Sequence, residues 1–322
     1  MNCLQKSVDK KKILVVGANC AWQKVLIFDA FAENKINRAK EIYQFASGKG
    51  INFARAAKIY GKFEPHALQF IGGMAGEAIL KDLSLENIET ANVTVEGETR
   101  TCTTCLNRAG GTTTEIIEPS PSASAENIAN FFEFSKILLS EPEFSAVAIC
   151  GTLINGVSTD LYFDIAENAI RNGKVLLLDT YRNMEKVFEL KSNSVILKIN
   201  RDELQELTHL NDVSEAMLNL INRYNFGAVL ITDGAEKSYL AINDGKFYEF
   251  ELPPLDKVLN PIGSGDTASG VFLSEYLSSG NLIESAKIAL AAASANCRSV
   301  KCGEFELDYM SEYAGKIRVY ER

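Results

Sequence analysis

The feature that most constrains the fold is a regular alternation of short apolar runs with helical stretches. "KILVVGA" (12–18) is a continuous apolar run, typical of a strand that is buried on both faces. Stretches such as "GINFARAAKIYG" (50–61) have the composition of helices and separate the successive apolar runs. Strands that alternate with helices form a mainly parallel sheet covered on both faces. We therefore predict an α/β fold with three layers, α/β/α.

The alternation resumes at residue 125 and continues toward the C-terminus. We expect strands at 145–150, 174–179, 194–199 and 227–232, and a hairpin over 239–250 that turns on Asp244-Gly245. We expect helices at 125–139, 158–172, 201–208, 213–225, 265–279, 283–300 and 308–320.

Two β-only segments, about 19–46 and 92–118, interrupt this pattern. The second is rich in Thr, Val and Ile and contains a Gly-Gly turn, which is typical of a hairpin or meander. We place both segments in a small separate sheet, a lid inserted in one domain that spans 12–322. Such a lid would cover the carboxyl ends of the parallel strands, where α/β proteins bind ligands. Its exposed edges and apolar surface favour a homodimer formed through the lid.

Composition excludes several classes of function. The net charge of −9 opposes binding to nucleic acid or to an anionic membrane surface, and no stretch has the length of a membrane helix. Seven cysteines, scattered through apolar segments, fit a reducing compartment, so we expect a cytoplasmic enzyme. Cys102 and Cys105 form a C-x-x-C within an expected strand, and without a second ligand pair they do not predict a zinc site. His66 and His209 are the only histidines and have no evident catalytic partner.

The stretch "NPIGSGDTASGVF" (260–272) places Asp266 after a Gly-Ser-Gly turn that opens a helix. The free N–H groups and the dipole of a helix start favour an anion, whereas a carboxylate repels a resting phosphate. Either Asp266 caps the helix, or the site needs both phosphate affinity and a base. The stretch also matches G-x-G-x-x-A, but it lies too late in the chain for a dinucleotide-binding turn.

Two other helix starts carry polar groups. "SGKG" (47–50) is either a plain glycine turn or an anion site that uses Lys49, and it lacks the pattern of a P-loop. In "KINRDEL" (198–204), Asn200 and Glu203 are three residues apart. They can form a capping box, or they can lie near a hydrated Mg²⁺, which needs few protein oxygens.

Nine motifs follow one another in a distinctive order. They are "SGKGINFARAAKIYG", "IGGMAGEAIL", "GETRTCTTCL", "TEIIEPSPS", "CGTLINGVS", "LLLDTYRN", "KINRDEL", "ITDGAEKSYLA" and "NPIGSGDTASGVF". In this order and spacing the chain resembles the ribokinase-like, phosphofructokinase-B (PfkB) type carbohydrate kinases, from about residue 12 to the C-terminal helix. The similarity is greatest to the branch of fructose-1-phosphate and tagatose-6-phosphate kinases.

The resemblance implies an α/β sheet with a small β lid and an enzyme that uses ATP and Mg²⁺. Asp266 would be the base that accepts the proton of the substrate hydroxyl. Gly263, Ser264 and Gly265 would form the anion hole for the transferring phosphoryl group. Phosphoryl transfer needs this combination of backbone dipoles and a carboxylate beside the nucleophile.

The resemblance also assigns the two substrates. Asn200 and Glu203 would order Mg²⁺ and phosphates, Thr232 and Gly234 would cradle the nucleotide, and Asn296 falls in the helix that borders the adenine pocket. The acceptor sugar would lie among Gln23, Lys35, Gly48, Lys49, Asn52, Arg100 and Thr152. Of these, Lys35, Lys49, Arg100 and Thr152 align with positions that hold the phosphate of a sugar-phosphate substrate.

The chain departs from the family on the acceptor side. Gln23 replaces an aspartate that usually grips sugar hydroxyls, Ser47 and Ser120 replace glycines, and "LING" replaces "LPPG". Arg100 lies mid-strand, where a long cation costs packing unless it reaches an anion, so we expect a hexose monophosphate as acceptor. Two alternatives stay open: a kinase of an unphosphorylated sugar or nucleoside, and a non-catalytic sugar-phosphate-binding protein.

Overall fold

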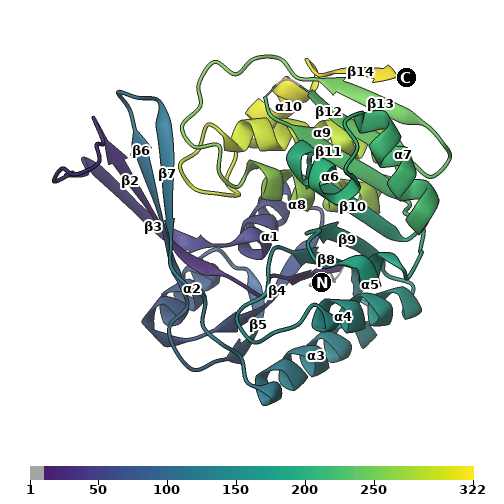
Figure 1. Cartoon of the computed structure of the whole chain (residues 1–322), viewed down its shortest axis with the longest axis horizontal. Coiled ribbons are helices and arrows are strands. Elements are labelled where there is room, and N and C mark those ends of the chain that lie inside the picture. Colours follow the sequence, from purple (N-terminus) through teal and green to yellow (C-terminus); the bar gives the residue numbers. More distant parts are fainter. Residues whose placement is uncertain (1–10, 236) are drawn as a thin grey trace, which may run out of the picture.

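The computed structural model describes residues 11–235 and 237–322 and contains two sheets (Figure 1). The large sheet has ten strands in the spatial order β14 (Arg318–Glu321), β13 (Phe247–Glu251), β12 (Lys237–Ile242), β11 (Ala228–Asp233), β10 (Val195–Asn200), β9 (Val175–Asp179), β8 (Phe144–Cys150), β1 (Lys12–Val16), β4 (Glu64–Ile71) and β5 (Glu89–Thr94). All neighbours from β11 to β5 pair in parallel, and β12, β13 and β14 extend the sheet antiparallel. The predicted mainly parallel sheet is confirmed.

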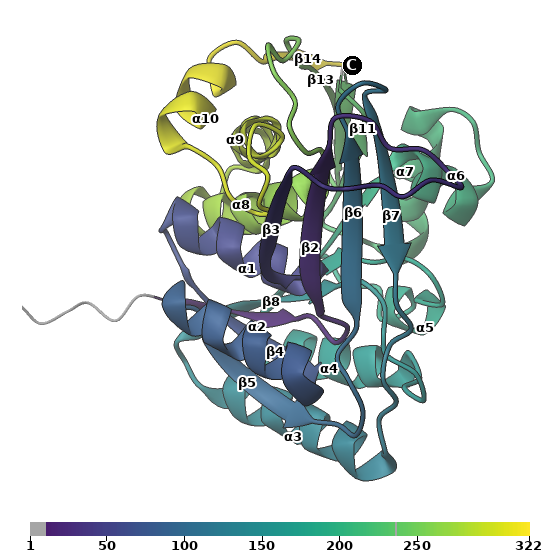
Figure 2. The ribbon, with the colours of Figure 1, turned by 90° about the vertical axis from the view of Figure 1, so that its left-hand side faces the viewer.

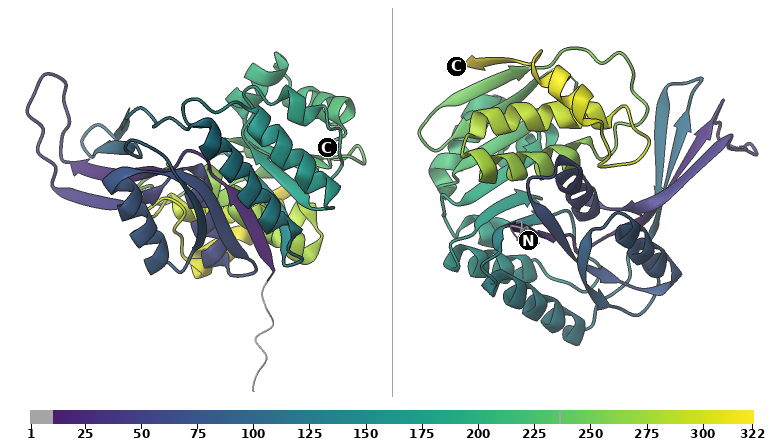
Figure 3. Two further views of the ribbon diagram at one scale, coloured as in Figure 1. Left: turned by 90° about the horizontal axis from the view of Figure 1, so that it is seen from below. Right: turned by 180° about the vertical axis from the view of Figure 1, so that it is seen from behind.

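Helices cover both faces of the large sheet, as the alternation predicts (Figures 1 and 3). One face carries α1 (Lys49–Tyr60), α2 (Gly73–Leu85), α8 (Ser264–Ser279), α9 (Leu282–Asn296) and α10 (Leu307–Ala314). The other carries α3 (Ala125–Ser140), α4 (Asp160–Arg171), α5 (Glu185–Phe188), α6 (Arg201–Thr208) and α7 (Val213–Tyr224). In β1, Ile13 packs toward the first group and Leu14 toward the second, which explains the unbroken apolar run of this strand.

The small sheet has four strands in the order β3 (Glu41–Ser47), β2 (Ala21–Phe28), β6 (Thr101–Asn107) and β7 (Thr112–Ile117), and Figure 2 shows it in front of the body. Its inner face packs on the body, where Val25 and Phe45 are buried with Cys302. On the outer face, Ile42 and Ile116 are each 56% exposed.

Three boundaries differ from the sequence prediction. Residues 92–94 do not join the small sheet, because β5 pairs in parallel with β4 after the crossover through α2 and buries Val93. A Thr- and Val-rich run fits the edge of a parallel sheet as well as a hairpin, so composition could not separate the two. Helix α9 ends at Asn296 rather than 300. Helix α10 ends at Ala314 rather than 320, and the chain then pairs β14 with β13.

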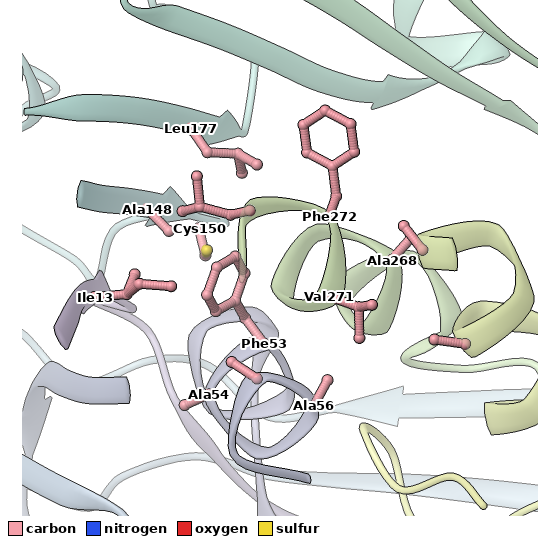
Figure 4. Packing of buried hydrophobic residues seen from close by; sticks show 14 of the residues in the cluster. Ile13, Phe53, Ala54, Ala56, Ala148, Cys150, Leu177, Ala268, Val271 and Phe272 are labelled. Carbon is pink, nitrogen blue, oxygen red and sulfur yellow. The ribbon is translucent and has the colours of Figure 1, made fainter. Parts of the chain in front are cut away.

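The close packing of α1 on α8 positions the site (Figure 4). Phe53 of α1 and Phe272 of α8 are fully buried, and each such side chain contributes about 1.5–3 kcal/mol of transfer free energy. The two backbones nearly touch at Gly270, where a Cβ atom would lie 2.5 Å from the carbonyl oxygen of Phe53. Across residues 11–235 and 237–322, no helix combines the length and the apolar character that a bilayer crossing requires.

Candidate active site

Polar side chains gather where the parallel strands end. Asp179 is the last residue of β9 and Asn200 the last of β10, while Gly151 and Thr152 follow β8. Thr232 lies beside Asn200 in the register of β10 and β11. The helices α1 and α8 begin at the same edge, so their free N–H groups and positive dipole ends face this region. The edge therefore suits an anionic ligand.

Asp266 lies in the first turn of α8 but does not cap it. The N-cap position is Gly263, which receives no side-chain cap. Asp266 Oδ2 instead accepts a hydrogen bond of 2.8 Å from Asn52 Nδ2, and Asn52 Oδ1 accepts one of 3.0 Å from the Ser47 hydroxyl. This relay fixes the orientation of the Asn52 amide and of the Asp266 carboxylate. The helix-capping alternative for Asp266 is thereby excluded.

Two buried carboxylates of the site have opposite pKa shifts. Burial raises the pKa of Asp266, and the negative charge of Asp179 adds to that rise against the opposing effect of Lys49. Burial also acts to raise the pKa of Asp179, but the ammonium groups of Lys198 and Lys49 outweigh it, and the pKa is lowered. Asp179 is therefore firmly ionised, whereas Asp266 holds a proton more readily than an ordinary aspartate.

Asp179 anchors two lysines beneath the start of α8. Its Oδ1 lies 2.8 Å from Lys49 Nζ and its Oδ2 lies 3.7 Å from Lys198 Nζ, while the Ser269 hydroxyl donates to Oδ2 at 2.6 Å. Lys198 Nζ is so near the backbone of Gly265 that a Cβ atom there would lie 2.9 Å from it. Two ammonium groups thus reinforce the positive end of α8, which suits an anion.

A pocket of about 370 Å³ opens beside Ser264 and Gly265. Its polar end is formed with Asn200, Thr232 and Gly234, and its walls are apolar. The apolar lining includes Leu252, Leu255, Val258, Leu290, Ala293 and Tyr313. A pocket with apolar walls and a polar end suits a ligand that has both an apolar part and an anionic part.

Asn200 and Glu203 form a capping box at the start of α6. Glu203 N donates to Asn200 Oδ1 and Asn200 N donates to Glu203 Oε2, both at 2.9 Å. The negative charge of Glu203 also helps to raise the pKa of Lys49, so its carboxylate faces the same region as the lysine. The capping interpretation describes the local structure, and it leaves Glu203 Oε1 available to a hydrated cation.

A second polar group lies between β1, β6 and the loop after β8. Arg100 directly precedes β6 rather than lying within a strand as predicted. Its Nη2 donates to the carbonyl oxygen of Asn19 at 3.2 Å, and Asn19 Nδ2 donates to Thr152 Oγ1 at 3.3 Å. Ser120 donates to Asn19 Oδ1 at 3.0 Å. Arg100 Nε is buried and has no hydrogen-bond partner among the described residues. A guanidinium donor without a protein partner is able to bind an anion through a charge-assisted hydrogen bond.

The other predicted site residues do not all lie together in these two polar groups. Gln23 is buried in the small sheet, and its Nε2 donates to Thr104 Oγ1 at 2.8 Å. Gly48 precedes α1 with a φ of 108°. Lys35 is exposed in the loop between β2 and β3, which leaves the small sheet at the end opposite Ser47. Asn296 Nδ2 donates to the carbonyl oxygens of Lys301 and Glu304 rather than toward the pocket beside Ser264, although its helix lines that pocket.

Three residues of the site, Asp179, Lys198 and Ser269, were not predicted from the sequence. A signal existed for the first two: Asp179 ends the run "VLLLD", and Lys198 interrupts the apolar run "VILKI". Charged residues in strands that are buried on both faces require charged partners, which tertiary structure supplies here. For Ser269, within a small-residue helix, no sequence signal points to the site.

A family model described as "pfkB family carbohydrate kinase" matches residues 10–308. Three solved structures share the fold. A "Possible 1-phosphofructokinase" from Thermotoga maritima has a TM-score of 0.85 and 21% identity, over 97% of this chain and 99% of that one. Phosphofructokinase-2 from Escherichia coli in complex with fructose-6-phosphate has a TM-score of 0.82 and 20% identity, over 95% and 99% of the two chains. The tetrameric inhibited form of the latter protein gives the same values.

Proposed function

Because the chain belongs to the pfkB family of carbohydrate kinases, and so transfers phosphate to an alcohol group, we propose that it phosphorylates a hydroxyl of a hexose monophosphate with ATP. The single observation that carries the choice of acceptor is the half-buried Arg100, whose Nε lacks a partner beside Asn19 and Thr152. A phosphate oxygen would accept a charge-assisted hydrogen bond from that donor, which is about twice as strong as a hydrogen bond to a neutral sugar hydroxyl.

Asp266 is the proposed base for this reaction. Asn52 holds its Oδ2, so Oδ1 is the oxygen left to accept the proton of the attacking hydroxyl. A raised pKa brings the carboxylate closer to the operating pH, which favours general-base catalysis. The backbone N–H groups from Gly263 to Asp266, with Lys198 behind Gly265, stabilise the charge on the transferring phosphoryl group.

The residues present fit ATP and Mg²⁺. The pocket beside Ser264 takes a nucleotide base between apolar walls, and its polar end at Asn200 and Thr232 meets the phosphates. Glu203 and Asn200 would hold the hydrated metal ion through their side-chain oxygens. When bound, Mg²⁺ would neutralise charge on the phosphate oxygens during transfer.

The small sheet is proposed to act as the lid of the acceptor site. Gln23 comes from β2 and Arg100 directly precedes β6, so two acceptor-side residues move with this sheet. Closure over the sugar would exclude water, which strengthens the electrostatic interactions at Asp266 and limits hydrolysis of ATP.

A phosphorylation panel tests the acceptor. Purified protein is assayed with ATP over free hexoses, nucleosides and hexose monophosphates, and the highest kcat/KM is expected for a monophosphate. Arg100→Ala should raise the KM for that substrate by about ten-fold or more, the equivalent of about 1.5–3 kcal/mol for a charged hydrogen bond, and should leave the KM for ATP unchanged. The control is Arg108→Ala, an exposed arginine of the small sheet that pairs with Glu41.

Two results would contradict the proposal. Equal activity on the unphosphorylated sugar, in wild type and Arg100→Ala alike, would favour the alternative of a free-sugar kinase. Saturable binding of a sugar phosphate with no turnover in the presence of ATP and Mg²⁺ would favour the non-catalytic alternative.

A further inference from the structure

A buried arginine of α1, Arg55, joins three segments of the chain behind the proposed catalytic centre. It is 3% exposed. Its Nε and Nη2 donate to the two carboxylate oxygens of Glu86, at 2.7 and 3.0 Å. Its Nη1 donates to the carbonyl oxygen of Cys302 at 2.7 Å, and its Nη2 also donates to the carbonyl oxygen of Ala46 at 2.8 Å. One planar group thus holds a carboxylate and two backbone carbonyls at once.

The first of these carbonyls lies where the small sheet joins α1. Ala46 is the next-to-last residue of β3, and its N–H donates to Asp82 Oδ2 of α2 at 2.8 Å. Both backbone hydrogen-bonding groups of Ala46 are therefore held by side chains of the body. Ser47 follows directly, and its hydroxyl orients the Asn52 amide that contacts Asp266. The position of Ala46 consequently sets the start of the relay to the proposed base.

The second carbonyl lies behind the turn that opens α8. Cys302 packs directly on Gly263, because a Cβ atom at Gly263 would lie 2.6 Å from Cys302 Cβ. Gly263 has a φ of 83° and is the first residue of the proposed anion hole. Cys302 therefore supports this turn from behind, and Arg55 holds Cys302 in place.

We propose that Arg55 is a positioning residue for phosphoryl transfer. It locks the end of β3 and the support of Gly263 into one rigid unit, so that Asp266 and the anion hole keep a fixed separation. This inference rests on the proposed function of Asp266. Reactions of this kind depend on geometry, and a misplacement of about 1 Å can lower the rate by about 100-fold.

The alternative hypothesis is that Arg55 only stabilises the fold, through its ion pair with Glu86. A matched control lies at the other end of α1, where that helix packs against α8. Glu275 of α8 is 6% exposed and bonds to Tyr60 of α1 and to the neighbouring Lys62. Glu275→Gln weakens the hydrogen bond from Tyr60 at the end of α1 and removes the ion pair with Lys62, which follows α1, at a distance from the proposed catalytic centre.

The experiment compares Arg55→Lys with Glu275→Gln in the full chain. Lysine keeps a positive charge for Glu86, but its single ammonium group cannot reach Ala46 and Cys302 together. With the hexose monophosphate that wild type prefers, we expect Arg55→Lys to lower kcat by about ten- to hundred-fold, with the KM for ATP little changed. Both variants should lower the melting temperature, and Glu275→Gln should keep the wild-type kcat.

A second measurement separates this inference from the function on which it rests. Hydrogen exchange of the free protein should show faster exchange of the 45–52 and 263–267 amides in Arg55→Lys and not in Glu275→Gln. Unchanged exchange, an unchanged kcat, or an equal fall of kcat in both variants would overturn the proposal, and the exchange result decides even if no sugar is phosphorylated. If Arg55→Lys does not fold, Asp82→Ala, which frees the Ala46 N–H, replaces it under the same criteria.

Discussion

Replacing each of the two buried carboxylates by its amide should have very different effects on stability: a large loss at Asp179 and little or no loss at Asp266. Asp179 is ionised and lies against Lys49 and Lys198, so Asp179→Asn leaves two ammonium groups without their counter-charge. Removing one partner of a buried ion pair costs about 3–5 kcal/mol. Asp266→Asn has a smaller effect, because an amide oxygen can still accept the hydrogen bond of Asn52. The change from a charged to a neutral acceptor costs about 1 kcal/mol, and the removal of a buried charge beside Asp179 offsets it.

The two pKa shifts predict how the folding stability of each variant differs from wild type as the pH changes. The folded-state pKa of Asp179 is lowered, so its stabilisation is present above the pKa of the unfolded chain and is lost as the pH falls through the folded-state value. The folded-state pKa of Asp266 is raised, so its ionisation destabilises the fold, and this penalty develops as the pH rises through the folded-state value. Asp266→Asn should therefore match wild type in acid and equal or exceed its stability at pH 8, whereas Asp179→Asn should be less stable at pH 8.

Urea unfolding at several pH values measures both free energies, and the kinase assay measures function. We expect the kcat of Asp266→Asn to fall by about two to four orders of magnitude, the range for a lost general base, with nucleotide binding retained. A wild-type rate would refute the base assignment. A loss of stability at pH 8 as large as that of Asp179→Asn would refute the electrostatic reasoning.

Two further experiments test the proposed metal ligand and the proposed dimer. Glu203→Gln should raise the Mg²⁺ concentration needed for the half-maximal rate. The melting temperature should stay close to wild type, because glutamine also completes a capping box. A lower melting temperature with the same Mg²⁺ dependence would show that Glu203 acts only as a helix cap. We also propose a homodimer through the outer face of the small sheet. The double variant Ile42→Asp with Ile116→Asp should therefore sediment as a monomer, whereas the control Ile137→Asp on α3 should not. An unchanged sedimenting mass of the double variant would place any dimer interface elsewhere.

The sequence predicts local structure well where one signal dominates. Apolar runs such as "KILVV" and capped starts such as Ser124 of α3 specify their elements because burial or a cap leaves few alternatives. Prediction fails where two environments accept the same composition. Val93 alternates with polar residues in β5, and an edge strand of the large sheet satisfies that pattern as well as a hairpin does.

The candidate site shows a different limit of prediction from the sequence. Motifs point to Asp266, Asn52 and Asn200 because short-range geometry, a helix start or a strand end, already places them. The pKa of Asp266, however, depends on Asp179, which lies 87 positions earlier in the numbering and is brought near only by the packing of α8 on the sheet. The same holds for Arg55, which a helical pattern marks simply as one residue of α1. Local sequence thus identifies groups that can do chemistry, whereas their charge state and separation are properties of the assembled core.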